Sequence, residues 1–554
     1  MSRRNNRKRE GVVGAILAFP DGILTLCCFA VPLVVIVLYS FWKIDLTTFT
    51  VTTNWNLGNY GDIFKSIYLQ ALLRSILITL ATVVGCLLLG LPIAYFIASC
   101  KGKLQLLMIG AIVIPFWTSF VVRTYAWLEL LGAHGVITQA LVHMHLVADG
   151  TDLRYSTTAV IIGMVYSYLP MMILPVYSTF EQLDQPLLEA AADLGKTPSQ
   201  AFFQIVMPSC GGGIVAGSLL VAHSSAWRIH HSGNPRRKQN VDDWQCHRQR
   251  IPNHRQLSAR CGALVRAHGR SAAHHHRKAD HAVEESTMKL RQHWFSAVMS
   301  AVVFVFLFLP IIVVFKDAFN ANKTLLTWGG ATFTWFGEAL SSERFRSAFL
   351  TSIGIAVVVM LLSMVLASLG AIGMSKMSGK AKGAYDSLVF LRITLPEIVI
   401  VVGLFVVARM LGFKLGPAWV VIAQTLIYSA YAFVTISARL TNISGLYEKA
   451  AQDLGASQAR IVWTITLPLL APSIFVGGLL AFTFSLDSVV APTFLGGPSA
   501  ETIPLLIMGM IKKGVSAEVN AIGVIMSVFN FLVLLIVVKF IGIKQVAGSA
   551  VKGS

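Results

Sequence analysis

Two polar stretches of the sequence are near-copies of each other: residues 189–208 read EAAADLGKTPSQAFFQIVMP, and residues 449–468 read KAAQDLGASQARIVWTITLP. The second copy lies 260 positions after the first without a gap, so that Gly195 matches Gly455 and every other position stays in register. A repeat at one constant offset indicates two similar halves in one polypeptide.

Each copy predicts two short helices joined by a glycine turn. In the first copy, Gly195 is placed to end one helix with a positive φ angle, and Thr197 can cap the next helix through a T-x-x-Q box that Gln200 completes. Pro208 is expected to end that second helix, and Ser457 is the corresponding cap in the second copy. The result is a helix–glycine–helix elbow. An ordinary amphipathic connector would not explain why it occurs twice with identical spacing.

The composition is that of an integral membrane protein. Of the 554 residues, 55% are apolar and only 13% are charged, against about 25% charged in an average soluble domain. Apolar runs of about 20 residues recur, and each can cross ~30 Å of hydrocarbon as a helix. They lie near 22–42, 72–99, 105–131, 158–179, 295–316, 348–374, 386–411, 418–437, 472–492 and 519–543. The predicted fold is an all-α membrane protein with two homologous transmembrane helix bundles, of about four and six spans.

The net charge is +19, and the basic residues are distributed along the chain as in a membrane protein, which argues against nucleic acid as a partner. Basic residues precede the first apolar run and follow the second run of each half, at Arg3, Arg4, Arg7, Lys8, Arg9, Lys101, Lys103, Lys376, Lys380 and Lys382. This positive-inside pattern predicts a multi-pass protein of the bacterial inner membrane with a cytoplasmic N-terminus. The seven cysteines show no spacing typical of metal ligands, so no metal site is expected.

The repeated elbow resembles the signature of permeases in binding-protein-dependent ABC importers. That signature combines E-A-A, a glycine six residues after the glutamate, and I-x-x-P. The first copy matches it in full, at Glu189, Ala190, Ala191, Gly195, Ile205 and Pro208. The second copy has Lys449 in place of the acid, with Glu448 as a candidate substitute, and otherwise matches at Ala450, Ala451, Gly455, Ile465 and Pro468. The resemblance covers about 1–222 and 288–554.

In that family the elbow is the coupling helix, which docks in a groove of the cytoplasmic ATPase and carries nucleotide-driven closure to the spans. The resemblance therefore implies a permease that works by alternating access in the lipid bilayer. Its implied partners are a cytoplasmic ABC ATPase dimer and a periplasmic solute-binding protein. ATP would be hydrolysed by the separate subunit, since the chain has no Walker A motif. The permease itself is then expected to be no enzyme, with no catalytic residues and no cofactor.

Three short segments resemble the two permeases of spermidine/putrescine importers. The first polyamine permease has a stretch similar to FVVRTYAW at 120–127. The second has stretches similar to LPEIVIVVGL at 395–404 and LDSVVAPTFLGG at 486–497. The resemblance implies a polyamine as the solute. Permeases of the same appearance import thiamine, iron and aminophosphonates, so these solutes remain alternatives.

Charged residues inside the apolar runs are the candidates for a solute pathway. A charge in a span is costly, so its presence suggests a function, and acids along a pathway would attract a polycation. The pathway candidates are Arg123, Glu129, Glu397 and Asp487, and further charges inside runs are Asp386 and Arg392. The alternative for each is a snorkelling or paired structural charge. Arg123 and Glu129 do not share a helix face, so no pairing between them is expected.

Residues 223–287 fit neither half. They hold ten of the fourteen histidines, and twelve Lys and Arg against five Asp and Glu. The apolar period stops here, and the preceding piece, 211–222, is too short to span a bilayer. We expect a cytoplasmic, largely disordered linker. The chain is thus divided into a first half at 1–222, truncated in its fifth span, the linker at 223–287, and a six-span second half at 288–554.

A gene read one base out of frame would explain this linker. With suitable codons, the stretch from Arg228 to Lys238 read one base later gives EFIIPEILGG, whose LGG falls 260 positions before the LGG that starts at Leu495. Met288 followed by Lys289 is ATG-AA, which the shifted frame reads as the stop codon TGA. One gained or lost base would then fuse two overlapping genes.

Two other classes of function remain open at this point. A secondary transporter with two six-span halves would have no ATPase for the elbows to bind. A membrane-anchored binding module would use the histidine- and arginine-rich segment, including His274, His275 and His276, to bind zinc or nucleic acid.

Overall fold

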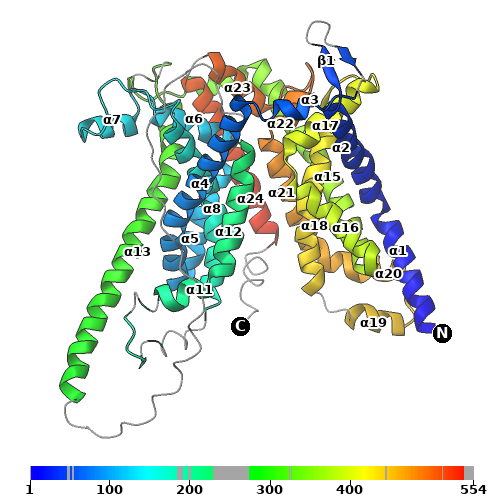
Figure 1. Cartoon of the computed structure of the whole chain (residues 1–554), viewed down its shortest axis with the longest axis horizontal. Coiled ribbons are helices and arrows are strands. Elements are labelled where there is room, and N and C mark those ends of the chain that lie inside the picture. The colour runs from blue at the N-terminus through cyan, green and yellow to red at the C-terminus, as the bar shows by residue number, and fades with distance from the viewer. Residues whose placement is uncertain are drawn as a thin grey trace. The chain divides into compact units, whose positions relative to one another are not determined.

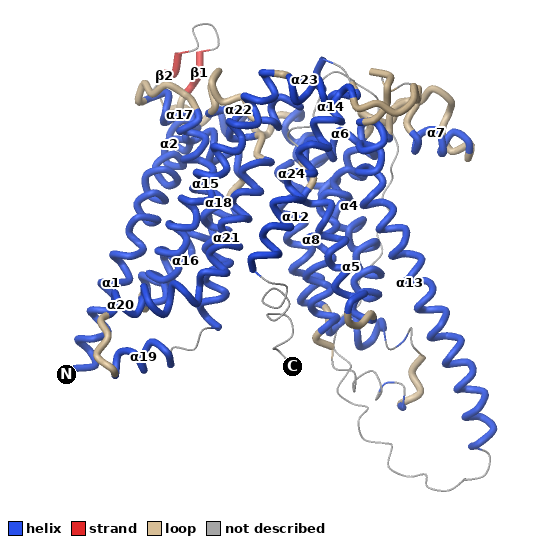
Figure 2. Tube along the Cα trace, turned by 180° about the vertical axis from the view of Figure 1, so that it is seen from behind, coloured by secondary structure: helices blue, strands red, loops and turns tan. Residues whose placement is uncertain are grey.

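The computed structural model describes residues 2–45, 50–52, 55–183, 191, 193–197, 200, 202–228, 274–323, 325, 327–442, 446–513 and 516–541. Most of these residues are helical, and two short strands, β1 (Lys43–Asp45) and β2 (Thr50–Thr52), pair antiparallel (Figure 1 and Figure 2). The chain divides into two compact units. Unit 1 contains 1–78, 107–166 and 304–554, and unit 2 contains 79–106 and 167–303.

Unit 1 is built around three long helices of the second half. They are α15 (Glu343–Lys376), α18 (Pro417–Asn442) and α21 (Leu467–Asp487), and each packs on the other two. Glycines allow the close approach, because a Cβ built on Gly477 of α21 would lie only 3.1 Å from Ala432 of α18. Small residues at such positions let helices in a membrane gain packing contacts where no hydrophobic drive holds them together.

The N-terminal helix of the first half belongs to the same unit. α1 (Ser2–Thr25) packs along α15. A π turn at Leu26–Ala30 joins it to α2 (Val31–Ser40), which packs against α17 (Glu397–Met410). A Cβ on Gly14 of α1 would lie 2.7 Å from the Gly373 carbonyl oxygen, so this contact too depends on glycine. The two halves of the repeat are therefore interlocked within unit 1.

Among the described residues, seven helices are long and apolar enough to cross a membrane, or eight if one bent pair counts as a single span. The seven are Gly11–Ser40, Ser66–Ser99, Thr157–Glu181, Ser296–Ala318, Glu343–Lys376, Pro417–Thr441 and Gln458–Asp487. Each of the ten predicted apolar runs overlaps a helix. The structure thus confirms the predicted all-α class of membrane helix bundles.

Two of the predicted spans are broken helices. The run at 105–131 folds as α5 (Lys103–Val113), a 3-10 turn at Ile114–Trp117 and α6 (Phe120–Leu130). The run at 386–411 folds as α16 (Gly379–Thr394) and α17, which are bent by 99°.

Prolines account for both breaks. Pro115 lies in the 3-10 turn, and Pro396 stands directly before α17 in an extended conformation with ψ of 137°. Proline lacks a backbone N–H and pushes the residue before it out of the helical region, as at Leu395 with ψ of 141°. The chain can resume as a helix only beyond each proline, and this leaves a new helix N-terminus inside each run.

Unit 2 contains the end of the first repeat. α12 (Gly211–Arg228) packs on α8 (Thr157–Glu181) through glycines, since a Cβ on Gly213 would lie 2.7 Å from the carbonyl oxygen of Pro175. The Tyr168 hydroxyl donates a hydrogen bond to the Ser224 carbonyl oxygen at 2.6 Å. Ser224 lies beyond the predicted end of the first half, so this part of the chain takes part in the packing.

Helices extend into both ends of the segment 223–287, which was predicted to be largely disordered. Helix α12 continues to Arg228, and α13 (His274–Ala318) begins at His274, which leaves 229–273 outside the described residues. The helical flanks contain neither proline nor glycine, and extending a helix is far easier than starting one. The apolar part of α12, Gly211–Ala222, is nevertheless too short to count as a span.

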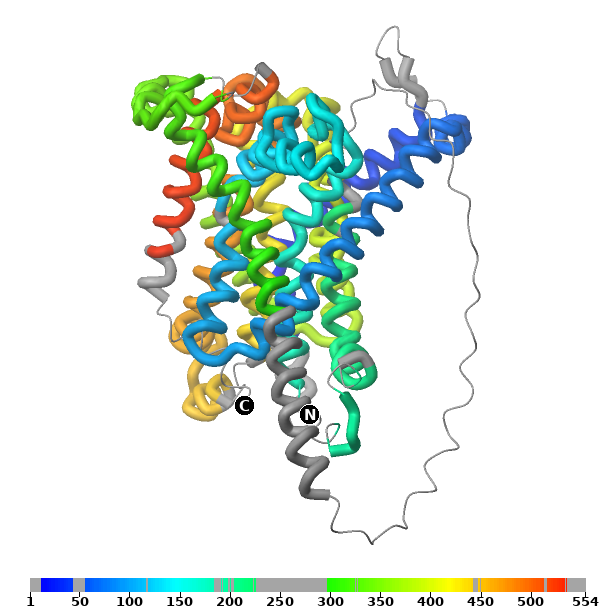
Figure 3. The backbone as a smooth tube through the Cα atoms, turned by 90° about the vertical axis from the view of Figure 1, so that its left-hand side faces the viewer, coloured from blue at the N-terminus to red at the C-terminus, as the bar shows by residue number. Residues whose placement is uncertain are grey.

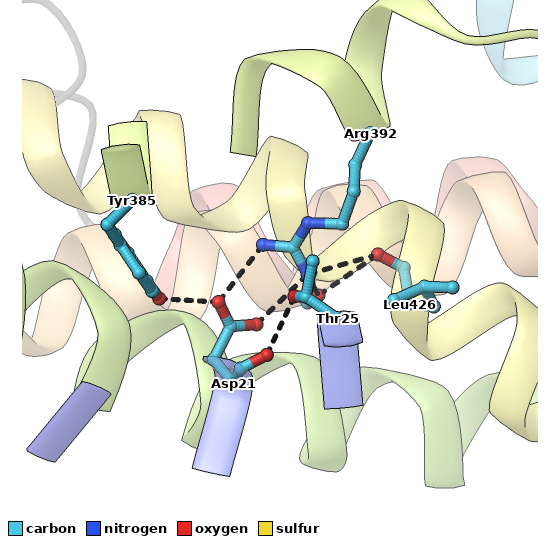
Figure 4. Close-up of polar contacts among 6 residues, drawn as sticks. Asp21, Thr25, Tyr385, Arg392 and Leu426 are labelled. Carbon is cyan, nitrogen blue, oxygen red and sulfur yellow. Dashed lines mark hydrogen bonds and ion pairs between the residues drawn. The ribbon is translucent and has the colours of Figure 1, made fainter. Parts of the chain in front are cut away.

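Two deeply buried charges among the described residues of unit 1 join α1 to α16. Arg392 donates from Nη1 to Asp21 Oδ1 and from Nη2 to Asp21 Oδ2, both at 3.0 Å, and the Tyr385 hydroxyl donates to the same carboxylate (Figure 4). The two charged side chains are 0% and 1% exposed. Arg392 Nη1 also lies 3.4 Å from the Ser429 hydroxyl. This charge inside a predicted span is therefore a paired structural charge, the alternative reading given above for such residues.

We predict that removing either partner of the Asp21–Arg392 pair strongly destabilises the fold. Asp21→Ala or Arg392→Ala should lower the free energy of unfolding by about 3–5 kcal/mol, because each leaves an uncompensated buried charge. The double substitution Asp21→Leu with Arg392→Met should cost much less. Denaturant unfolding of the full chain in detergent measures both. The matched control is Arg344→Ala, whose partner Glu501 is 36% exposed, and its cost should stay at or below about 1 kcal/mol. Equal losses at the buried and exposed pairs would contradict the prediction.

Candidate functional site: two elbows and the ends of two broken spans

The first elbow has the predicted glycine turn and capping box. Gly195 has φ of +75°, and the Lys196 N–H donates to the Ala191 carbonyl oxygen at 3.1 Å. The Thr197 N–H donates to Gln200 Oε1 at 3.0 Å, and the Gln200 N–H lies 3.4 Å from Thr197 Oγ1. Both halves of the capping box are thus present. The signature residues Glu189 and Ala190 lie outside the described residues.

The second elbow repeats this geometry 260 positions later. It consists of α19 (Leu446–Asp453) and α20 (Gln458–Ile461). Gly455 has φ of +81°, and its N–H donates to the Gln452 carbonyl oxygen at 2.9 Å, while the Ala456 N–H donates to that of Ala451 at 3.0 Å. These two bonds define a Schellman C-cap. Ser457 is the N-cap and accepts from the Arg460 N–H at 3.4 Å, as predicted.

Only the backbone conformation requires glycine at the two turns. A Cβ built on Gly195 or Gly455 would have nothing within 4 Å of it. A residue with a side chain is nevertheless strained at positive φ. The expectation of a positive φ at both positions is therefore confirmed.

The helix that contains Pro208, α11 (Met207–Ser209), ends one residue after this proline, close to the predicted end, whereas Pro468 of the second copy does not end a helix. A π turn precedes each proline, at Phe202–Val206 and at Val462–Thr466, and it contains the signature isoleucine. In the second copy the Leu467 N–H bonds to the Val462 carbonyl oxygen, and the helix then continues through Pro468 into α21. A wider turn tolerates proline because the helix is already locally unwound. The second elbow is thus continuous with a helix that runs from Gln458 to Asp487, 30 residues in all.

Side chains brace the second elbow. The Thr466 hydroxyl donates to Glu448 Oε1 at 2.9 Å, which links the π turn to α19. The Lys376 ammonium donates to Gln458 Oε1 at 2.7 Å, which links α20 to the end of α15. Glu448 therefore already has a partner within its own elbow. Lys449 lies in α19, and its side chain is outside the described part of the chain.

Each elbow exposes apolar side chains that the sequence reading passed over. Leu194 is 80% exposed and its counterpart Leu454 is 90% exposed, while Trp463 in the second π turn is 73% exposed. The signal was present in the sequence, because D-L-G is identical in both copies. Within unit 1, α19 and α20 lie at one end of the helices, and α22 (Val490–Leu495) lies at the other (Figure 1 and Figure 3).

The far end of α21 meets the two broken spans. Asp487 Oδ1 accepts from the Ser119 hydroxyl at 2.8 Å and from the Phe120 N–H at 2.7 Å, at the start of α6. The next residue, Ser488, donates from its hydroxyl to Glu397 Oε1 at 3.0 Å, at the start of α17. Two of the predicted pathway acids are thus brought to one place, although they are far apart in the sequence.

Aromatic rings surround this end of α21. The Tyr428 hydroxyl lies 3.5 Å from Glu397 Oε1, and the ring centroids of Tyr428 and Tyr431 lie 5.7 Å and 5.4 Å from that of Phe484. Acids beside aromatic faces form an environment that attracts organic cations.

The other two pathway candidates lie elsewhere along α6. Arg123 is 7% exposed and lines a small cavity with Val122, Pro310, Val314 and Ser527, among others. Glu129 lies two turns further on, beside Asp317 of α13 and Asn520 of α24 (Ala517–Ile541). The structure does not bring Glu129 to Asp487, and Asp386, the remaining charge inside a run, is exposed.

The chain matches the family described as binding-protein-dependent transport system inner membrane component twice, over residues 90–226 and 363–541. Each match includes one of the two elbows. Together the two matches cover more than half of the chain. This chain belongs to that family.

Curated relatives match different parts of the chain. The spermidine/putrescine transport system permease protein PotB of Salmonella typhimurium is 36% identical over 218 residues, which are 39% of this chain and 74% of PotB. The permease protein PotC of Haemophilus influenzae is 34% identical over 229 residues, 41% of this chain and 89% of PotC. PotC of Escherichia coli is 31% identical over 233 residues, 42% of this chain and 88% of PotC.

The chain therefore combines two ABC importer permease halves in one multi-pass protein of the inner membrane. A secondary transporter, which was open from the sequence alone, is excluded by the family.

Proposed function

We propose that this chain is the permease of an ATP-driven importer of polyamines, with spermidine or putrescine as the solute. The observation that carries the proposal is the doubled elbow, which keeps the same glycine turn, cap and π turn at one offset. Relatives named as spermidine/putrescine permeases match both parts of the chain, and they support the choice of solute.

The elbows are the proposed docking sites of a cytoplasmic ABC ATPase dimer. Leu194, Leu454 and Trp463 are exposed apolar side chains on turns that backbone hydrogen bonds hold rigid. Such side chains suit a hydrophobic groove in a partner protein. The coupling residues are those of the signature: Glu189, Ala190, Ala191, Gly195, Ile205, Pro208, Lys449, Ala450, Ala451, Gly455, Ile465 and Pro468. ATP is hydrolysed by the partner, and the permease holds no cofactor.

Charge placement supports the orientation. The N-terminus of α1 and the junction of α15 with α16, where Lys376, Lys380 and Lys382 lie, belong to the end of unit 1 that carries α19 and α20 (Figure 1). The positive-inside rule then places this end and the N-terminus in the cytoplasm. A periplasmic solute-binding protein would deliver the solute at the opposite end.

Glu397, with its neighbouring tyrosines, is the proposed attractor of the cationic solute, and Arg123 and Glu129 complete the proposed lining of the pathway, while Asp487 lies next to it at the start of α6. Carboxylates in a low dielectric attract a polycation more strongly than the same groups would in water. The pathway is shared by the halves, because α6 comes from the first and α17 from the second.

We also propose that residues 223–287 are a translation of the wrong frame and that the functional halves are 1–222 and 288–554. The first family match stops at residue 226, close to the proposed shift. With suitable codons, the shifted frame gives LGG at the offset of the repeat, and the codons of Met288 and Lys289 end that frame, as an overlapping gene would.

The glycine turns provide the test of coupling. Gly195→Val and Gly455→Val should each weaken co-purification of the ATPase and lower ATP-driven uptake, because a β-branched residue at positive φ costs about 1–3 kcal/mol. Gly110→Val is the matched control, since Gly110 also has open space around it but no positive φ. Unchanged ATPase binding and uptake in both elbow variants would remove the coupling proposal.

The solute is tested by competition. Uptake of radiolabelled spermidine into vesicles with the ATPase and binding protein should be competed by unlabelled spermidine or putrescine, because the acids near α17 favour cations. Competition by neutral or anionic solutes alone would refute the polyamine assignment and leave the family membership intact.

The reading frame is tested on the DNA. Resequencing from codon 222 to codon 288 should show a shifted frame that is open and encodes apolar runs. Stop codons inside that frame before Met288, or an absence of apolar runs, would refute the frameshift and require a separate explanation for the histidine-rich segment.

A further inference from the structure

We propose that Asp487 is a positioning residue rather than a contact for the solute: it latches the helix that continues from the second elbow to the start of α6. Motion at the ATPase side would then reach the broken span of the other half directly. This inference rests on the proposed coupling role of the second elbow.

The N-terminus of α6 is capped by a residue from the other half of the chain. The first N–H groups of a helix have no partner within that helix, and in most proteins the side chain just before it supplies one. Ser119 precedes α6 but gives no such cap. Instead, both the Ser119 hydroxyl and the Phe120 N–H donate to Asp487 Oδ1, which is 367 residues away from Phe120 along the chain. The N-terminus of α6 is therefore held by the other half of the repeat.

The negative charge of Asp487 is compensated at the start of α6. The N-terminal end of a helix carries a partial positive charge that favours a carboxylate. One oxygen of Asp487 accepts two hydrogen bonds at the start of α6, so its negative charge is already compensated there. Glu397 stands at the start of its own helix, where the Ser488 and Tyr428 hydroxyls lie 3.0 Å and 3.5 Å from its Oε1. Of these two acids, Glu397 is the better attractor for a cation, and Asp487 is the better cap.

One continuous helix connects the second elbow to Asp487. The helix from Gln458 to Asp487 has 30 residues and is therefore about 45 Å long. It begins in the second elbow, where Lys376 donates a hydrogen bond to its first residue, Gln458. Its other end contacts α6 through Asp487 and α17 through Ser488. A displacement of the elbow along this helix must move, or detach, the N-termini of both broken spans together.

The first half lacks the matching residues. The positions 260 before Asp487 and Ser488 are Trp227 and Arg228, at the end of α12. Neither tryptophan nor arginine can accept a hydrogen bond from a helix N-terminus. These two positions therefore cannot repeat the latch that runs from the second elbow to the first half.

Hydrogen–deuterium exchange of the full chain in lipid nanodiscs tests the cap without solute or ATPase. Asp487→Ala should speed exchange in the peptide that contains Phe120 by roughly five- to tenfold, the usual worth of a helix cap. Asp487→Asn should stay within about twofold of the parent, because its amide oxygen still accepts both bonds. Glu501→Ala is the control at a carboxylate outside the latch. Unchanged exchange in Asp487→Ala would overturn the proposal.

The same measurement tests transmission. Adding the ATPase with a non-hydrolysable ATP analogue should change exchange at Phe120 in the parent chain and not in Gly455→Val. If the parent responds to the ATPase everywhere except at α6, the latch does not transmit and the proposal fails, although elbow coupling stands. If the parent does not bind the ATPase, the coupling proposal fails. The capping role of Asp487 is still tested by the exchange measured without ATPase.

Uptake separates the latch from a solute contact. Asp487→Ala should lower the maximal uptake rate by about tenfold with an unchanged half-saturating solute concentration, while ATP hydrolysis continues. Asp487→Asn should restore uptake to within about twofold of the parent. If Asp487→Asn instead raises the half-saturating concentration as much as Asp487→Ala does, the charge contacts the solute and the latch is refuted.

Discussion

A backbone N–H inside a bilayer has no water to bond with, and this constraint governs the part of the structure in which function is concentrated. Pro115 and Pro396 interrupt two spans and so expose helix N-termini within apolar runs. Asp487 provides acceptors at the first of these ends, and Ser488 engages the acid at the second. The charge of Asp487, which would be costly alone, is stabilised by the donors at the start of α6. At α6, the break in the helix and the acid beside it thus follow from one requirement, an acceptor for the donors at a helix N-terminus.

The buried charges of unit 1 show how differently the same residue types can act. Asp21 and Arg392 satisfy each other with paired hydrogen bonds, and they fasten the N-terminal helix of the first half to the second half. Asp487 bonds to a backbone instead, at a point that must release or shift if the broken spans move. The first arrangement favours a permanent contact, because breaking it leaves two bare charges. The second can exchange partners at the modest cost of a helix cap.

The elbows combine rigidity with exposure. Their glycine turns, Schellman bonds and side-chain caps fix the angle between two short helices, while Leu454 and Trp463 remain open to a partner. The π turn that follows lets the second elbow run without interruption into α21 despite Pro468. A rigid surface joined to a continuous helix is what a device needs if it is to convert the closure of an ATPase into movement of spans.

The sequence by itself determined the membrane class, the duplication, the apolar runs and the local chemistry of the elbows. These follow from composition and from short-range rules, since a positive φ at Gly455 or a cap at Ser457 depends on a few neighbouring residues. It also marked Arg392, Glu397 and Asp487 as unusual charges. Only the tertiary structure decided their partners, because Asp21 lies 371 residues from Arg392 and Ser119 lies 368 from Asp487. No local pattern encodes such distances. Whether a charge in a span is a structural pair, a cap or a contact for a solute depends on which distant helix packs against it.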